Sequence, residues 1–219
     1  MTPHLRKLAL SAHVTFSVGW LGAVAGFLAL AVAGLTSQDA QMVRAAYLAM
    51  DLTTRFVIVP LALASLLTGI VQSLVTPWGL FRHYWVLFKF LLTVVAAIVL
   101  LLQPPRISYL AGVAAETTLS SADLRFLRIS LLIHAAVGLV VLLVTAGLGM
   151  YKPRGMTRYG MRKQRKQGDT EVGPRFGLRT RTPHWVKVFA VIVVVLVVLI
   201  GIMMLAGGHG PGAHMPSGG

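Results

Sequence analysis

The sequence of 219 residues contains no cysteine and only six acidic residues. The lack of cysteine excludes disulfides, thiolate metal sites and cysteine nucleophiles. It does not indicate a compartment, because a chain without cysteine works in either redox environment. Charged residues make up 12% of the chain, whereas about 25% is usual in soluble domains. The composition therefore excludes an ordinary soluble domain.

The motifs of the common enzyme classes are also missing. The sequence has no pattern for a Ser–His–Asp nucleophilic site, paired catalytic carboxylates, a P-loop, a Rossmann fingerprint or the zinc-binding HExxH motif. Hydrolytic and nucleotide-driven mechanisms lose their usual support, so we expect a protein without enzymatic activity.

Apolar residues are abundant, at 56% of the chain, and the mean hydropathy is +0.78. Several apolar runs reach the roughly 20 residues that a helix needs to cross about 30 Å of hydrocarbon. The sequence therefore predicts an all-α polytopic membrane protein. We expect five spans, at residues 8–35, 56–75, 84–102, 126–150 and 186–206.

The predicted organisation has four parts. Residues 1–150 form an antiparallel four-helix transmembrane bundle, 151–184 a basic cytoplasmic linker, 185–206 a fifth, peripheral transmembrane helix, and 207–219 a disordered Gly/His/Met tail. A signal peptide is the competing interpretation of the first apolar run, because Ala31-Val32-Ala33 resembles a cleavage site. The length of the run favours a retained helix.

Two polar stretches are expected outside the membrane. Residues 36–54 should lie on its surface and contain a short amphipathic helix capped by Asp39. The third span should end at Pro104-Pro105, where the polar segment 106–123 follows. Small residues recur every three or four positions in the first span and predict helix packing: Ser11, Thr15, Gly19, Gly22 and Gly26.

The net charge is +14, and ten of the twenty basic residues lie between Lys152 and Arg181. Such a block beside a spanning helix is more typical of contact with anionic lipid than with nucleic acid. Placing the N-terminus in the cytoplasm and the C-terminus outside puts the basic loops inside, as the positive-inside rule requires. A membrane-protein partner or a homo-oligomer stays open.

Ionisable residues within the spans are the first candidates for a functional site, because a charge in the bilayer costs roughly 3 kcal/mol. They are His13, Lys89 and His134, and Trp85 shares a helical face with Lys89. His13 and Lys89 should lie in one layer. His134 should lie about 8–10 Å away in depth, too far for both histidines to ligate one haem iron.

Each candidate also has a purely structural interpretation. The histidines can bond a Ser, a Thr or a backbone carbonyl of a neighbouring helix, and Lys89 can extend its ammonium toward the headgroups. The sharper hypothesis is that Lys89 holds an anionic group. In the tail, His209, His214 and Met215 are ligand types that suit copper, against the alternative of a disordered low-complexity segment.

Three segments carry a resemblance to known membrane proteins: LRKLALSAHVTFSVGWLGAV, PLALASLLTGIVQSLVTPWGLFRHYWVLFKFLLTVV and LIHAAVGLVVLLV. Over residues 5–150 the chain resembles a bacterial integral-membrane family of unknown function, the DUF-2269-like group. It is more distantly similar to CopD-type copper-resistance domains and HemJ-type protoporphyrinogen oxidases, through the first-helix histidine and the Trp-x-x-x-Lys pattern. The resemblance implies a bacterial inner membrane and assigns His13 and Lys89 to the matching positions. A histidine found much nearer the lysine in the oxidase type is missing here.

These observations favour two functions. The first is a non-enzymatic integral membrane protein, an accessory subunit or a small transport component. The second is a haem- or copper-handling membrane protein, with haem b or copper held by His13 and an anionic group held by Lys89. Porphyrin oxidation is a third possibility.

Overall fold

The structure is a computed structural model that describes residues 3–75, 80–116 and 122–151. Beyond them it describes single residues and one short stretch, namely 156, 157, 159, 161, 186–188, 191, 194 and 198. Helices are the only named elements in these ranges. Four of the helical runs are long and apolar enough to cross a membrane: His4–Thr36, Ala40–Leu74, Tyr84–Glu116 and Leu124–Tyr151. The prediction of an all-α membrane protein with four helices in its first 150 residues is thus confirmed at this level.

The first long helix is α1 (Pro3–Thr36), and a three-residue connection leads from it into α2 (Ala40–Thr53). Asp39 caps α2, since its carboxylate accepts a hydrogen bond of 2.9 Å from the backbone N–H of Gln41. This cap satisfies one of the free N–H groups at the helix start, as the sequence predicted.

Residues 36–54 do not form a separate surface segment. The helix continues from α2 through the π-helical turn η1 (Thr54–Ile58) into α3 (Val59–Val75). The physical reason is the turn before Pro60, which has no N–H and whose ring presses on the carbonyl four residues earlier. The π turn widens the helix there, with the Val59 N–H donating to the Thr54 carbonyl, so the chain passes the proline without ending.

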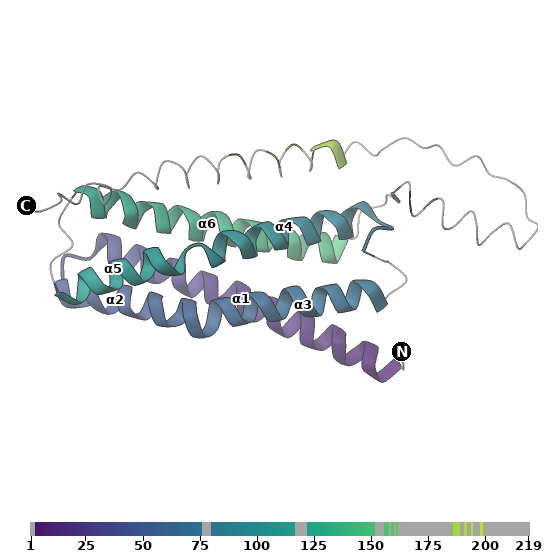
Figure 1. Cartoon of the computed structure of the whole chain (residues 1–219), viewed down its shortest axis with the longest axis horizontal. Coiled ribbons are helices and arrows are strands. Elements are labelled where there is room, and N and C mark those ends of the chain that lie inside the picture. Colours follow the sequence, from purple (N-terminus) through teal and green to yellow (C-terminus); the bar gives the residue numbers. More distant parts are fainter. Residues whose placement is uncertain are drawn as a thin grey trace, which may run out of the picture.

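The third predicted span, residues 84–102, matches the next helix closely, but a further helix begins at Pro104-Pro105, where the sequence predicts a polar segment. After α4 (Tyr84–Leu101) the chain breaks for only two residues, and the prolines open a new helix, α5 (Pro104–Glu116), that follows on from α4 (Figure 1). Proline is well tolerated in the first turn of a helix, where its missing N–H has no partner to lose. The expected polar segment is therefore largely helical.

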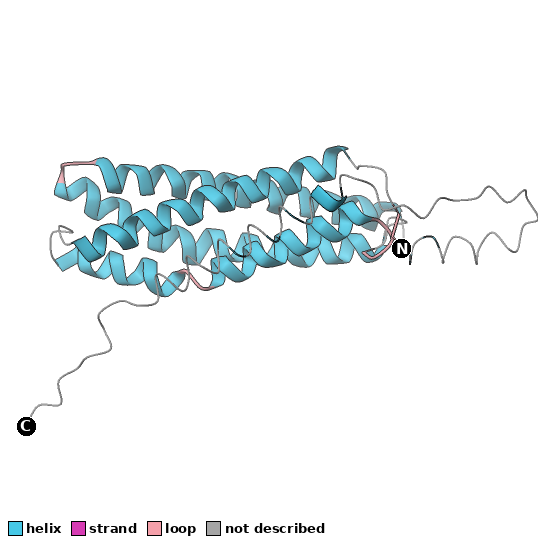
Figure 2. Cartoon of the chain, turned by 90° about the horizontal axis from the view of Figure 1, so that it is seen from above, coloured by secondary structure: helices cyan, strands magenta, loops and turns pink. Residues whose placement is uncertain are grey.

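The fourth long helix, α6 (Ala122–Tyr151), runs back beside α4 and α1. The four long helices lie side by side along the long axis of the molecule in both views (Figures 1 and 2). α1 packs against α3, α2 and α6, while α4 packs against α6 and α3, so successive helices are antiparallel neighbours. A core of large side chains fills the centre, among them Trp20, Phe27, Tyr47, Met50 and Ile107.

The predicted fifth span lies mostly outside the described residues. Of this span the structure describes Val186–Val188 and three further positions, all helical. Val186 is buried against Phe88 and Leu148, while Val188 is exposed. Of the basic linker 151–184, the structure describes only a few positions around Thr157, whose N–H donates to the carbonyl of Arg82 at 2.9 Å.

Four of the five small residues predicted to pack in the first span are exposed in this chain: Ser11, Thr15, Gly22 and Gly26. A side chain added at Gly22 or Gly26 would meet nothing within 4 Å, whereas at Gly19 it would lie 3.4 Å from Leu61. Gly22 and Gly26 face outward because Trp20, Val24 and Phe27 supply the buried face of α1.

Candidate functional site

His13 lies between α1 and α3 and is hydrogen-bonded to α3. Its Nδ1 donates to the carbonyl of Ser65 at 3.1 Å and lies 3.3 Å from the hydroxyl of Thr68. A side chain at Gly69 would come within 3.0 Å of the His13 ring, so the glycine is what gives the ring room. His13 thus has the contacts that its purely structural interpretation predicts, namely hydrogen bonds to a neighbouring helix.

Lys89 extends from α4 toward α6. A side chain at Gly149 would lie 3.3 Å from the Lys89 Nζ, so Lys89 faces α6, whereas His13 is bonded to α3. Trp85 is buried one turn before Lys89. Among the described residues, no salt bridge to Lys89 occurs.

His134 projects from α6 in another part of the molecule. Its Nδ1 lies 2.7 Å from the carbonyl of Ser130; a carbonyl only accepts, so Nδ1 carries the hydrogen. In the neutral ring Nε2 is then an acceptor, and this atom is buried without a partner in the part of the chain that is described.

The two histidines lie at different levels. His134 lines a cavity together with Trp20 and Ile58, whereas His13 bonds Ser65. Trp20 follows His13 by seven residues, and Ser65 follows Ile58 by seven, which corresponds to about 10 Å along each helix. One iron cannot take both rings as ligands in this arrangement.

The cavity that His134 lines lies between α1, η1, α4, α5 and α6. Its volume is about 100 Å³, and its wall is almost entirely apolar. Along the third long helix the lining extends from Leu92 to Ile107, and along α6 from Leu131 to Leu142. Fifteen residues of helix correspond to about 22 Å, so the cavity is long and narrow rather than round.

Three polar side chains in this apolar wall lack partners. The atoms concerned are Trp20 Nε1, both amide atoms of Gln103 and His134 Nε2, all buried and without a hydrogen bond to any described residue. Trp20 is 3% exposed and Gln103 is 5% exposed. A buried polar group left unpaired costs about 1–3 kcal/mol, and native proteins keep few of them. Unpaired groups gathered on one cavity point to a bound molecule.

Sequence reasoning found only one of these three residues. Gln103 stands directly before Pro104-Pro105 and reads as a residue of the helix end, while Trp20 lies in an apolar, glycine-rich run where a tryptophan normally belongs to the core. A glutamine at the end of an apolar run was a signal that could have been weighed. The break between α4 and α5, which places Gln103 in the cavity, cannot be predicted from the sequence.

Polar and charged side chains join the helices at the end opposite Lys89. Arg55 donates to Asp51 at 3.1 Å and to the hydroxyl of Ser108 at 2.6 Å, linking α2 to α5. Arg128 donates to the Tyr47 hydroxyl at 2.8 Å and to the Gly34 carbonyl, linking α6 to α2 and α1. These contacts mark a polar level on all four long helices.

The distance between the charged ends matches a bilayer. On the third long helix 17 residues separate Lys89 from Arg106, about 25 Å along the axis and close to the roughly 30 Å of a hydrocarbon core. Gln103 precedes Arg106 by three residues and His134 follows Arg128 by six. Gln103 and His134 thus lie just inside one boundary of the apolar zone.

No family model, no curated protein and no solved structure matches this chain. The resemblance to the DUF-2269-like, CopD-type and HemJ-type groups therefore stays a prediction.

His13 and His134 do not share one metal site, because they stand at different levels. The cavity lined by His134 is also smaller than the roughly 300–1,000 Å³ of typical ligand pockets. No cluster of three or more His, Cys, Asp or Glu side chains occurs within the described ranges. The predicted copper ligands His209, His214 and Met215 lie outside those ranges.

Proposed function

We propose that this chain is a non-enzymatic protein of the bacterial cytoplasmic membrane, an accessory subunit or small transport component, that binds a small amphipathic molecule between its four long helices. The N-terminus would lie in the cytoplasm. One observation carries the proposal: an apolar cavity is lined by buried polar atoms of Trp20, Gln103 and His134 that have no partner among the described residues.

The polar atoms define the kind of group that the ligand presents. Trp20 Nε1 donates, the Gln103 amide donates and accepts, and neutral His134 accepts at Nε2. A ligand head with oxygen atoms that accept and donate hydrogen bonds, such as a hydroxyl or a carboxylic group, pairs them. Pairing removes the cost of burying these groups alone, and this gain strengthens binding.

The remaining wall defines the rest of the ligand. The volume is about 100 Å³, and the lining covers about 22 Å along the third long helix, which is longer than an extended ten-carbon chain. An aliphatic chain therefore fits the narrow wall made by residues such as Leu92, Val99 and Leu142. A tetrapyrrole has several times as many atoms in a flat ring and does not fit.

The position of the cavity gives the ligand a direction. Gln103 and His134 lie near the charged level formed around Arg55 and Arg128, whereas Leu92 and Leu142 lie toward the middle of the helices. A molecule with its polar end near the membrane boundary and its chain toward the centre places both ends in matching surroundings.

Trp20 provides a reporter for this binding. Of the four tryptophans, Trp78, Trp85 and Trp185 are replaced by phenylalanine, and the purified variant is reconstituted in phosphatidylcholine vesicles. Decanol carrying a bromine at the chain end is then added, since bromine quenches indole fluorescence on contact. We expect saturable quenching of Trp20, weakened severalfold to tenfold in Gln103→Leu and His134→Leu versions, because each loses about one hydrogen bond.

A second reporter controls for quenching from the bilayer. A variant that keeps only Trp85, which is buried but does not line the cavity, should show only the weak, non-saturable quenching that the lipid causes. Equal quenching of Trp20 and Trp85, or quenching of Trp20 that never saturates, would overturn the proposal.

A further inference from the structure

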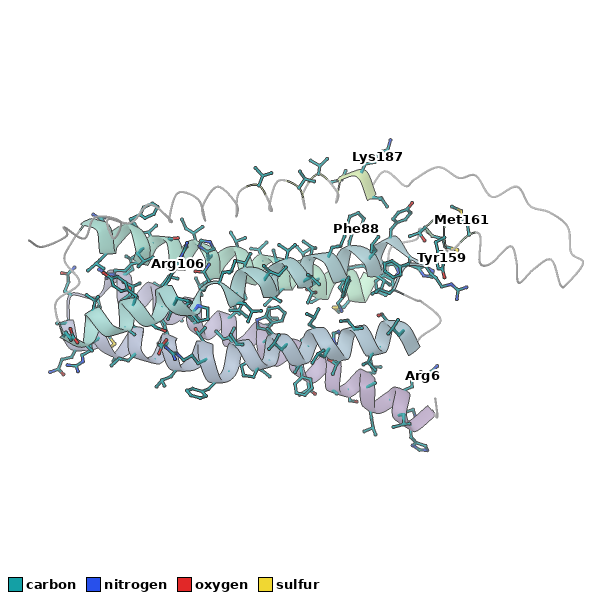
Figure 3. The ribbon with its side chains drawn as sticks, in the orientation of Figure 1. Arg6, Phe88, Arg106, Tyr159, Met161 and Lys187 are labelled. Carbon is teal, nitrogen blue, oxygen red and sulfur yellow. The ribbon has the colours of Figure 1, made fainter. Side chains whose placement is uncertain are left out.

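Arg106 carries a buried cationic nitrogen without a partner beside the cavity. One of its two terminal guanidinium nitrogens, NH1, is buried and has no hydrogen bond to the described residues. Arg106 lies near the start of α5, where this helix follows α4 beside α6 (Figure 3). A guanidinium is always charged and needs hydrogen-bond acceptors, preferably anionic ones.

Arg106 stands beside the polar end of the cavity. Gln103, three residues before it, and Ile107, directly after it, both line the cavity, whereas Arg106 itself is not a lining residue. Gln103, one turn before Arg106, also has an unpaired amide. Arg106 and Gln103 thus offer a charged donor and a neutral donor at the same end of the cavity.

Among the described residues, no acidic side chain pairs with this nitrogen. Asp51, the acidic residue near this level, is engaged by Arg55 and by the hydroxyl of Ser108. None of the described residues that line the cavity is an aspartate or a glutamate. A bound molecule with an acceptor at this end of the cavity would complete the hydrogen bonding of Arg106.

We propose that the ligand of the cavity is a single-chain amphiphile with an anionic head, such as a medium-chain carboxylate, whose head pairs with Arg106 and Gln103. This inference rests on the proposed function and adds the charge of the ligand. The single chain follows from the narrow shape of the cavity, since two chains side by side exceed its volume. The anionic head follows from the unpaired guanidinium nitrogen. The acceptor atoms of Gln103 and His134 can then accept hydrogen bonds from a hydroxyl or a water molecule.

The test compares two brominated ten-carbon probes, decanoate and decanol, on the variant that keeps only Trp20. At pH 8 the carboxylate is ionised, and the two probes differ in the head alone. After correction for partition into protein-free vesicles, we expect decanoate to bind about tenfold to a hundredfold more tightly than decanol, the range of a charge-assisted hydrogen bond.

Two arginine variants identify the residue responsible. Arg106→Gln should remove the preference for decanoate over decanol, and circular dichroism and thermal unfolding in the same vesicles show whether the variant is folded. Arg106→Lys should keep part of the preference, because it keeps the charge but loses the planar geometry. Arg125→Gln is the matched control: Arg125 is an exposed arginine at the same end of α6, and its loss should leave the preference intact.

The possible results separate this inference from the proposed function. Equal binding of decanoate and decanol, or a preference that survives Arg106→Gln or disappears equally in Arg125→Gln, overturns the anionic ligand but leaves the cavity site. Failure of both probes to quench Trp20 overturns both proposals. A third probe, a single-chain phospholipid, distinguishes a carboxylate from a lipid phosphate as the natural head.

Discussion

At the scale of single residues, the difference between His13 and Gln103 lies in the partners that the neighbouring helices provide. His13 donates to Ser65, 52 positions along the chain, and the bond holds α1 against α3. Gln103 is more deeply buried than His13 and has an unpaired amide. A polar group that is hydrogen-bonded, such as His13, stabilises the fold. A buried polar group without a partner, such as Gln103, lowers the stability.

This contrast leads to opposite effects of the same kind of substitution. Gln103→Leu should raise the free energy of unfolding by about 1–3 kcal/mol, because it removes two unpaired polar atoms from an apolar wall. His13→Leu should lower it by about 1 kcal/mol, because it breaks a formed hydrogen bond. Chemical unfolding in lipid–detergent mixed micelles measures both. A loss of stability in Gln103→Leu would show that the amide has partners.

At the scale of elements, close packing of α1 on α3 depends on residues without bulk at a few positions. A side chain at Gly69 would come within 3.0 Å of the His13 ring, whereas one at Gly26 would meet nothing within 4 Å. Both glycines are in helices, so the local conformational effect of an added methyl group is the same. Only the neighbouring helix differs.

The substitution Gly69→Ala should therefore destabilise the protein by about 1–3 kcal/mol through overpacking. The matched control Gly26→Ala should be neutral or stabilising by up to about 1 kcal/mol, since alanine has the higher helix propensity. Thermal unfolding of both variants in the same lipid mixture compares them. Equal loss in the two variants would show that Gly26 also faces a helix, such as one of a second copy of the chain.

At the scale of the whole molecule, the lengths of the helices exceed the thickness of the hydrocarbon core. The long helices have 33, 35, 33 and 28 residues, about 40–50 Å each, compared with about 30 Å of hydrocarbon. The excess lies at one end, where α2 and α5 continue past the contacts of Arg55 and Arg128. The cavity and its polar groups lie just inside this end.

The lack of cysteine makes the membrane topology directly measurable. Single cysteines replace Gln38, between α1 and α2, and Phe81, which is 57% exposed in the turn before α4. With the proposed cytoplasmic N-terminus, a membrane-impermeant maleimide should label Gln38→Cys in intact cells and Phe81→Cys only after permeabilisation. The reverse pattern would place the N-terminus outside, and labelling of both from one side would contradict a spanning first helix pair.

The sequence by itself determined the class of the protein and the location of four apolar helices. The reason is that a helix needs about 20 apolar residues to cross a bilayer, and such a run is contiguous in the sequence. It also placed the Asp39 cap, whose partner lies two residues away. It did not determine that the helices continue through Pro60 and restart at Pro104, since a π turn and a two-residue break depend on packing by α1, α5 and α6. Only the tertiary structure decided which polar groups find partners: His13 meets Ser65 across two helices, whereas Gln103 and Trp20 meet an apolar cavity. A hydrogen bond depends on distances between residues far apart in the chain, and no local pattern contains them.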